Sequence, residues 1–243
     1  MVLETSASNF PFKATLEDNY STIRREVDAL MQYHPSRGGI TGGINRNFQM
    51  WPQEGVYNRG WNLCGLLAGY TQDTYQRIED NCALVPETVR ILESIPGIHN
   101  AGFSVVNDGT YIRPHRGPVS IIRVHLGIII PSNCAIRIAG ETCYWQEGKV
   151  FPAFDDTVVH EAWNYGGGGA PRVILLMDFD AEKLPSNLTT TAARRGWKEN
   201  LGEAFQSARC NFYNASGIRP SGLVNVPHKI TQKMAYALKS RQG

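Results

Sequence analysis

The stretch that decides the fold opens with Ala101-Gly102-Phe103-Ser104-Val105-Val106 and closes with Arg172-Val173-Ile174-Leu175-Leu176-Met177-Asp178-Phe179. Both runs are dominated by apolar and β-branched residues, which favour strands. Similar runs occupy residues 119–130, 134–138 and 149–154, with turn residues between them. Short strands at such intervals are typical of a β-sandwich or a small barrel. The sequence therefore predicts a mainly β core between residues 101 and 179.

Composition is that of an ordinary globular protein. The chain has 243 residues, of which 42% are hydrophobic and 19% charged, and its formal net charge is +2. Such a charge is too small to indicate binding to nucleic acid or to an anionic membrane. No apolar run has the length of a signal peptide or a membrane span, and the five cysteines form no CxxC pair. We therefore expect reduced thiols and a cytoplasmic location, with neither nucleic acid nor membrane as a partner.

Helices are predicted before the β core. Apolar residues recur at helical spacing over residues 21–33 and 82–95, and a proline follows each run or lies at its end. Residues 1–20 are polar and are predicted to be extended, whereas residues 61–70 are predicted to form a strand that crosses the core. The fold class expected is therefore mainly β with flanking helices.

The chain becomes polar and mildly basic after Leu184, with helical periodicity near residues 192–209 and 229–239. We expect this extension to pack on the core or to join two subunits in a homodimer. The predicted organisation has three parts: an N-terminal helical and loop segment packed on the core (1–60), the β core (61–183) and a C-terminal helical extension (184–243).

Two arginines and a histidine are expected inside the core. Side chains alternate between the two faces of a strand, so Arg123 and His125 share one face of the 119–130 run. Arg172 begins another apolar strand. Burying these groups is costly unless a partner satisfies them. The partner could be an anionic small molecule, or a carboxylate among Asp155, Asp156 and Asp178, and the spacing leaves both readings open.

His115 and His160 are the candidate metal ligands. Imidazole is a common ligand for iron, zinc and copper, and ligands on separate strands are held rigidly. The alternative reading is that each is a structural histidine. The histidines at 34, 99 and 228 have no supporting neighbours and are predicted to lie at the surface or in packing positions.

The order of these motifs resembles the catalytic domain of the aspartyl/asparaginyl β-hydroxylases, over about residues 60–180. The pieces that carry the resemblance are Phe103-Ser104-Val105, Gly109-Thr110, Pro114-His115-Arg116-Gly117-Pro118, Arg123-Val124-His125-Leu126-Gly127, Ile130-Pro131, Glu141-Thr142, Trp145, Glu147-Gly148-Lys149-Val150, Phe154-Asp155-Asp156, His160-Glu161, Trp163 and Arg172. The resemblance implies a double-stranded β-helix core, of the jelly-roll or cupin-like type. It also implies the cofactors iron(II), 2-oxoglutarate and dioxygen.

The same resemblance implies a role for each site residue. His115 and His160 would bind iron, while Arg172 and Ser104 would bind the distal carboxylate of 2-oxoglutarate. His125 would contact the carboxylate beside the keto group, and Arg123 would bind a carboxylate of the substrate.

The resemblance also implies an iron site with only two protein ligands. Related oxygenases supply a third ligand from a carboxylate two residues after the first histidine. Here that residue is Gly117, which cannot bind a metal, and water would take the position. Asp156 would orient this water. Arg113 and Arg116 flank His115 and are expected to contribute to substrate binding.

The expected function is hydroxylation of an unactivated C–H bond in a small carboxylate-bearing substrate, such as a free amino acid, a short peptide or a metabolite. Succinate and carbon dioxide would be released. One alternative keeps the cofactors but ends in desaturation, ring formation or halogenation; the negative charge of Asp156 would disfavour a nearby halide. The other is a cupin-like protein that binds a metal or ligand without redox chemistry, which the full set of pocket residues argues against.

Overall fold

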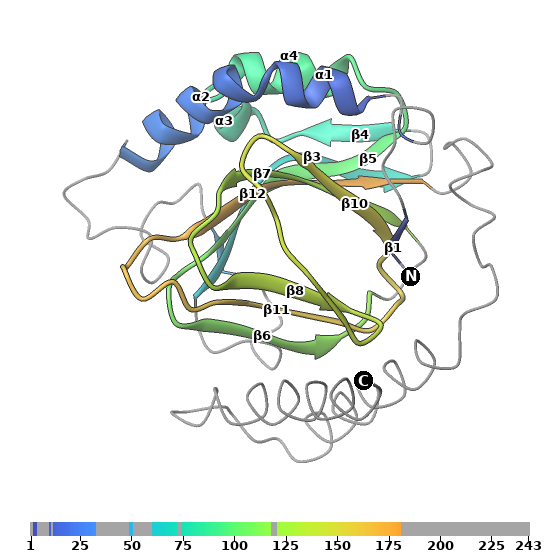
Figure 1. Cartoon of the computed structure of the whole chain (residues 1–243). Coiled ribbons are helices and arrows are strands. Elements are labelled where there is room, and N and C mark those ends of the chain that lie inside the picture. The colour runs from blue at the N-terminus through green and yellow to red at the C-terminus, as the bar shows by residue number, and fades with distance from the viewer. Residues whose placement is uncertain are drawn as a thin grey trace, which may run out of the picture.

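Two antiparallel β-sheets face each other in the computed structural model, which describes residues 2–3, 10, 12–32, 49–50, 60–71, 74–117 and 121–180 (Figure 1). The large sheet has the strand order β1-β10-β7-β12-β5-β3-β2, with β4 paired to β3, and the small sheet has the order β6-β11-β8-β9. The strands are β1 (Val2–Leu3), β2 (Gln49–Met50), β3 (Trp61–Thr71), β4 (Thr74–Arg77), β5 (Ile98–Val106), β6 (Thr110–His115), β7 (Ile122–Ile129), β8 (Cys134–Ile138), β9 (Glu141–Cys143), β10 (Val150–Asp155), β11 (His160–Asn164) and β12 (Arg172–Phe179).

The chain passes back and forth between the two sheets from β5 to β12, with β8 and β9 forming a hairpin within the small sheet. This alternation is the connectivity of a double-stranded β-helix, so the predicted fold class is confirmed. The inner faces of the sheets enclose the space in which the predicted site residues lie.

Four helices cover the outer face of the large sheet, on the side away from the small sheet (Figure 1). They are α1 (Lys13–Asp18), α2 (Tyr20–Gln32), α3 (Glu79–Cys82) and α4 (Pro86–Glu93). The amphipathic pattern predicted α2 correctly, because Ile23, Val27 and Leu30 form its buried stripe.

Two predictions about the helical regions were wrong. Residues 13–18, expected to be extended, form α1, whose buried Leu16 anchors it to the core. The helix expected over residues 82–95 is shorter, because α3 ends at Cys82 and α4 occupies only residues 86–93. Pro86 begins α4, since proline has no N–H to continue a preceding helix and is favoured at the first helical turn.

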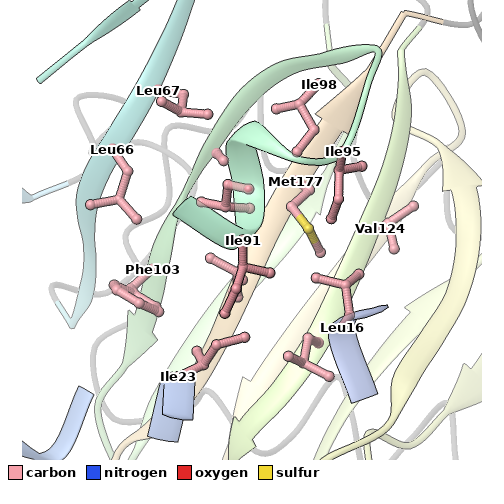
Figure 2. Close-up of a cluster of buried hydrophobic side chains, with 14 of the residues drawn as sticks. Leu16, Ile23, Leu66, Leu67, Ile91, Ile95, Ile98, Phe103, Val124 and Met177 are labelled. Carbon is pink, nitrogen blue, oxygen red and sulfur yellow. The ribbon is translucent and has the colours of Figure 1, made fainter. Parts of the chain in front are cut away.

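The apolar core of the described residues has two main layers. One lies between the helices and the large sheet, where Ile91, Phe103, Val124 and Met177 pack together (Figure 2). The other lies between the two sheets and includes Phe151, Phe154 and Ile174. Alternate residues of each central strand therefore face the helices or the space between the sheets.

The strands that carry the candidate metal ligands were not predicted. His115 is the last residue of β6 and His160 the first residue of β11. The β11 segment reads His-Glu-Ala-Trp-Asn and is buried on both faces, so it lacks the alternation of apolar and polar residues that marks a half-buried strand.

Several predictions concern residues outside those described. They include the helical pieces near 192–209 and 229–239 and the subunit contact expected of residues 184–243. Within the described residues, no helix combines the length and the hydropathy needed to cross a membrane.

Candidate metal and anion site

A cavity between the two sheets lies among the predicted site residues. Six of the nine predicted residues line it, from β5, β6, β7, β11 and β12: Ser104, His115, Arg123, His125, His160 and Arg172. Residues that are far apart in the sequence therefore meet in one pocket.

His115 and His160 lie side by side. Their strands pair with the two residues directly in register, and the imidazole centroids are 4.2 Å apart. The Nδ1 atom of each ring lies 2.8 Å from a backbone carbonyl, that of Arg113 for His115 and that of Val158 for His160. A carbonyl only accepts, so Nδ1 carries the proton and Nε2 keeps its lone pair in both rings.

Both rings are neutral at physiological pH. Burial, with the neighbouring His160, lowers the pKa of His115 to about 3, and burial lowers the pKa of His160 to about 4. Neutral imidazoles with a fixed tautomer are the form that binds metals. Within the described part of the chain, no group of three or more His, Cys, Asp or Glu side chains is arranged to hold a metal. The free Nε2 lone pairs make His115 and His160 a candidate pair of metal ligands.

Asp156 fills the space that a side chain at Gly117 would need. A Cβ atom built on Gly117 would lie 1.8 Å from Asp156 Oδ2, and the Gly117 amide donates to the Asp156 carbonyl at 2.8 Å. The Asp156 Oδ1 atom lies 3.5 Å from His160 Nε2. A larger residue at position 117 would therefore have to displace the Asp156 side chain, and glycine supplies no metal ligand of its own.

Arg123 is neutralised by two buried carboxylates. It is the cross-strand neighbour of Asp178, to which Nε and Nη2 donate at 2.8 and 3.1 Å, and its Nη1 donates to Asp156 at 2.5 Å. Burial acts to lower the pKa of Arg123, but the charges of Asp178 and Asp156 outweigh it and raise that pKa. Of the two partners predicted for Arg123, the carboxylates are therefore the correct one, and its burial needs no anionic ligand.

Arg172 has no such counter-ion. It is 3% exposed, its Nη2 donates to Ser104 Oγ at 3.0 Å, and no carboxylate among the described residues pairs with it. Its Nε has no hydrogen-bond partner, and its guanidinium lies 5.0 Å from the centroid of the Trp145 ring. Burial lowers the pKa of Arg172 to about 10, so it remains a cation. A buried, unneutralised cation on the cavity wall is a site for an anion.

The candidate anion-binding wall of the cavity consists of Arg172, Ser104 and His125. Ser104 Oγ accepts bonds from both Trp61 Nε1 and Arg172 Nη2, at 3.0 Å each, so its own proton is available to a ligand. Burial, followed by the charges of Arg123 and Arg172, holds the pKa of His125 well below its usual value. Trp61 had no predicted role, and a sequence pattern could not have found one because its contact with Ser104 depends on how β3 pairs with β5.

Arg113, Arg116 and Asp156 do not line the cavity. Arg113 is buried but lies outside the lining, and Arg116 is exposed. Their predicted part in substrate binding therefore gains no support from the cavity. Asp156 reaches the site indirectly, through Arg123 and His160.

The three histidines of the cavity predict a strong pH dependence of stability in the metal-free protein. Their folded pKa values lie below the unfolded value of about 6.5, so the unfolded chain binds more protons below that pH. Stability should fall as the pH drops from about 6.5, by up to about 1.4 kcal/mol per pH unit for each histidine. Urea unfolding in a chelator at pH 7, 6 and 5 measures this. A His115→Gln variant should show a shallower slope, and equal unfolding free energies at pH 7 and 5 would contradict the assignment.

The sequence profile of the aspartyl/asparaginyl beta-hydroxylase family matches residues 17–182 of this chain. The match begins earlier than the resemblance in the motifs, so it also takes in α2. The ornithine lipid ester-linked acyl 2-hydroxylase of Rhizobium tropici is 32% identical over 176 residues, covering 71% of this chain and 58% of that protein. Human aspartyl/asparaginyl beta-hydroxylase is 37% identical over 110 residues, covering 42% of this chain and 14% of that protein.

Similarity to solved structures is weaker. A prolyl-4-hydroxylase of Pseudomonas putida has a TM-score of 0.39 and 12% identity, covering 68% of this chain and 97% of that one. A 2OG-Fe(II) oxygenase family protein of Burkholderia pseudomallei has a TM-score of 0.38 and 10% identity, covering 49% of this chain and 66% of that one.

The chain spans 58% of the length of the Rhizobium relative and 14% of the human one. The family profile nevertheless covers more than half of this chain and contains every residue of the cavity lining. By its sequence, this chain belongs to the aspartyl/asparaginyl beta-hydroxylase family.

Proposed function

We propose that this chain is an iron(II)- and 2-oxoglutarate-dependent dioxygenase that hydroxylates an unactivated C–H bond and releases succinate and carbon dioxide. The observation that carries the proposal is Arg172, a buried guanidinium without a carboxylate partner among the described residues, on the wall of the cavity that contains His115 and His160. An anion and a metal would therefore share one pocket. Membership of a hydroxylase family supports the same chemistry.

The paired histidines fit iron(II). Two neutral imidazoles with free Nε2 lone pairs supply the protein ligands, and their backbone contacts through Nδ1 keep the rings from turning. With Gly117 in place of a carboxylate, coordination positions stay open for a chelating keto acid, water and dioxygen.

The anion wall fits 2-oxoglutarate. Arg172 and Ser104 would bind the distal carboxylate, since both have donors left over, and His125 would contact the carboxylate beside the keto group. Arg123 is not assigned to a carboxylate of 2-oxoglutarate, because Asp156 and Asp178 already neutralise its charge.

Held by these residues, iron(II) and 2-oxoglutarate would supply an oxidant strong enough for an unactivated C–H bond. The chain's own residues bind and orient these groups. Apolar side chains such as Ile112, Ile174 and Leu176 line the rest of the cavity and keep bulk water out. Asp156, held by Arg123, would orient a water molecule at the position that Gly117 leaves open.

The proposed substrate is a small carboxylate-bearing molecule, and only the resemblance of the motifs to the hydroxylase family supports this class. The burial of Arg123 does not support this substrate class, because Arg123 has two counter-ions without a substrate. Relatives whose names specify an ornithine lipid acyl chain and aspartyl or asparaginyl residues act on different molecules, so family membership does not choose the substrate.

The test is the affinity for 2-oxoglutarate. Arg172→Ala should weaken binding by about 2–4 kcal/mol, because it removes one partner of a buried charge-assisted pair. Arg172→Lys should restore only part of the loss, since lysine lacks the planar fork of donors. Isothermal titration with manganese in place of iron measures binding without turnover. Arg90→Ala, an exposed arginine of α4, is the matched control and should bind normally.

Equal affinities for the parent and Arg172→Ala would show that the anion binds elsewhere. Succinate release by the parent protein, supplied with iron(II), 2-oxoglutarate and dioxygen, separates the dioxygenase from a cupin-like protein without redox chemistry.

A further inference from the structure

Trp145 lies against both of the residues proposed to bind 2-oxoglutarate. Its indole Nε1 is 3.2 Å from His125 Nδ1, and the guanidinium of Arg172 lies 5.0 Å from the centroid of its ring. Trp145 is 4% exposed and also packs on Phe151, with ring centroids 5.6 Å apart. One buried side chain therefore contacts both His125 and Arg172 of the anion-binding wall.

The indole determines which nitrogen of His125 carries a proton. The indole N–H can only donate, so the Nδ1 atom that it meets must be unprotonated. The burial that holds the pKa of His125 low keeps the ring neutral, and its single proton is then on Nε2. His125, which lines the cavity, is thus an N–H donor through Nε2, whereas His115 and His160 carry lone pairs on the same nitrogen.

The position of Trp145 depends on Gly127, which follows His125 by two residues on β7. A Cβ atom at Gly127 would lie 2.2 Å from the carbonyl oxygen of Gln146, the residue after Trp145. The Gly127 amide donates to Lys149 O at 3.1 Å, and Gly148 N donates to Gly127 O at 2.9 Å. The segment that follows β9 therefore lies directly on β7, which brings the indole to His125.

We propose that Trp145 is a positioning residue for the co-substrate, which holds His125 in the Nε2–H tautomer so that it donates a hydrogen bond to a carboxylate of 2-oxoglutarate. The identity of the ligand, 2-oxoglutarate, rests on the proposed function, whereas the tautomer of His125 follows from its contact with Trp145 alone. Without the indole N–H, His125 can move its proton to Nδ1 and present a lone pair to the anion, which repels it.

The tautomer is measured first, on metal-free protein without ligand. Nitrogen-15 NMR of the histidine rings distinguishes a protonated from an unprotonated ring nitrogen, and His125→Gln identifies the resonances of His125. We expect the Nε2–H form in the parent and a shift toward the Nδ1–H form in Trp145→Phe and Gly127→Ala. Trp61→Phe, which removes an indole N–H from Ser104 instead, should leave the His125 tautomer unchanged.

Affinity for 2-oxoglutarate is measured next, with manganese bound. Trp145→Phe keeps an aromatic ring under Arg172 and should weaken binding about tenfold, the range of one hydrogen bond to a charged group. In a His125→Gln background, the same Trp145→Phe change should have little further effect, because the imidazole that the indole controls is absent. Manganese affinity should stay the same in all these variants.

The outcomes separate this inference from the proposed function. A parent protein that binds no 2-oxoglutarate overturns the proposed function and the ligand named here. A parent that binds it, with His125 in the Nδ1–H form, overturns only the inference. So does Trp145→Phe with unchanged affinity, or an equal loss in the His125→Gln background. The tautomer of the parent is decisive even if Trp145→Phe fails to fold.

Discussion

Replacing His115 or His160 with alanine is expected to abolish stoichiometric iron binding. Each change removes one of the two proposed protein ligands, so the affinity should fall by more than the 10–100-fold that is typical of losing an outer-shell partner. Elemental analysis of protein reconstituted anaerobically with iron(II) measures the stoichiometry. Because neither ring carries a charge in the folded protein, both variants should still fold at neutral pH.

His125→Gln is the matched control for the metal experiment. His125 is the third histidine of the same cavity, but its Nδ1 accepts from Trp145, so it has no free lone pair for a metal. This variant should keep its iron. Full iron occupancy in His115→Ala and His160→Ala would remove the ligand assignment, and with it the proposed site.

Replacing Arg123 with glutamine is expected to destabilise the fold by about 3–5 kcal/mol, the cost of breaking a buried ion pair by removing one partner. The reason is that Asp156 and Asp178, each with a side chain only 6% exposed, would lose their shared counter-ion. Burial already raises the pKa of Asp156, and the charge of Asp178 adds to that effect. The free energy of unfolding in urea measures the loss.

Two further variants test whether the loss comes from the buried carboxylates. Arg123→Gln combined with Asp178→Asn should recover part of the stability, because one of the two stranded charges is removed. Arg24→Gln removes an arginine that pairs with Asp28 and Glu147 at the surface, and it should cost less than about 1 kcal/mol. If Arg123→Gln lowered the free energy of unfolding no more than Arg24→Gln does, Asp156 and Asp178 would not depend on Arg123 as their counter-ion.

This result would also bear on the substrate. An Arg123 that serves the fold can still contact a substrate, since it lines the cavity, but its guanidinium already donates to both carboxylates. A loss of activity in Arg123→Gln could therefore arise from a displaced Asp156 beside the proposed metal site as well as from weaker substrate binding. Comparison of substrate affinity requires the variant to be folded under the conditions of the assay.

Local patterns in the sequence determined the layers of the protein. The alternation along residues 122–128 placed Val124 and Leu126 under the helices and Arg123 and His125 toward the cavity, because a strand has a period of two whatever it pairs with. The stripe of Ile23, Val27 and Leu30 likewise predicted α2. The ordered motifs also identified the family and the two histidines that β6 and β11 bring together.

Only the tertiary structure decided which arginine is available to a ligand. Arg123 and Arg172 look alike in the sequence, each a cation within an apolar strand. The pairing of β7 with β12 sets Asp178 opposite Arg123, and no carboxylate among the described residues takes that place for Arg172. The same holds for Trp145, whose contact with His125 requires its segment to lie on Gly127. Strand register and loop packing arise from contacts between distant parts of the chain, whereas a sequence pattern reports only the faces of each element on its own.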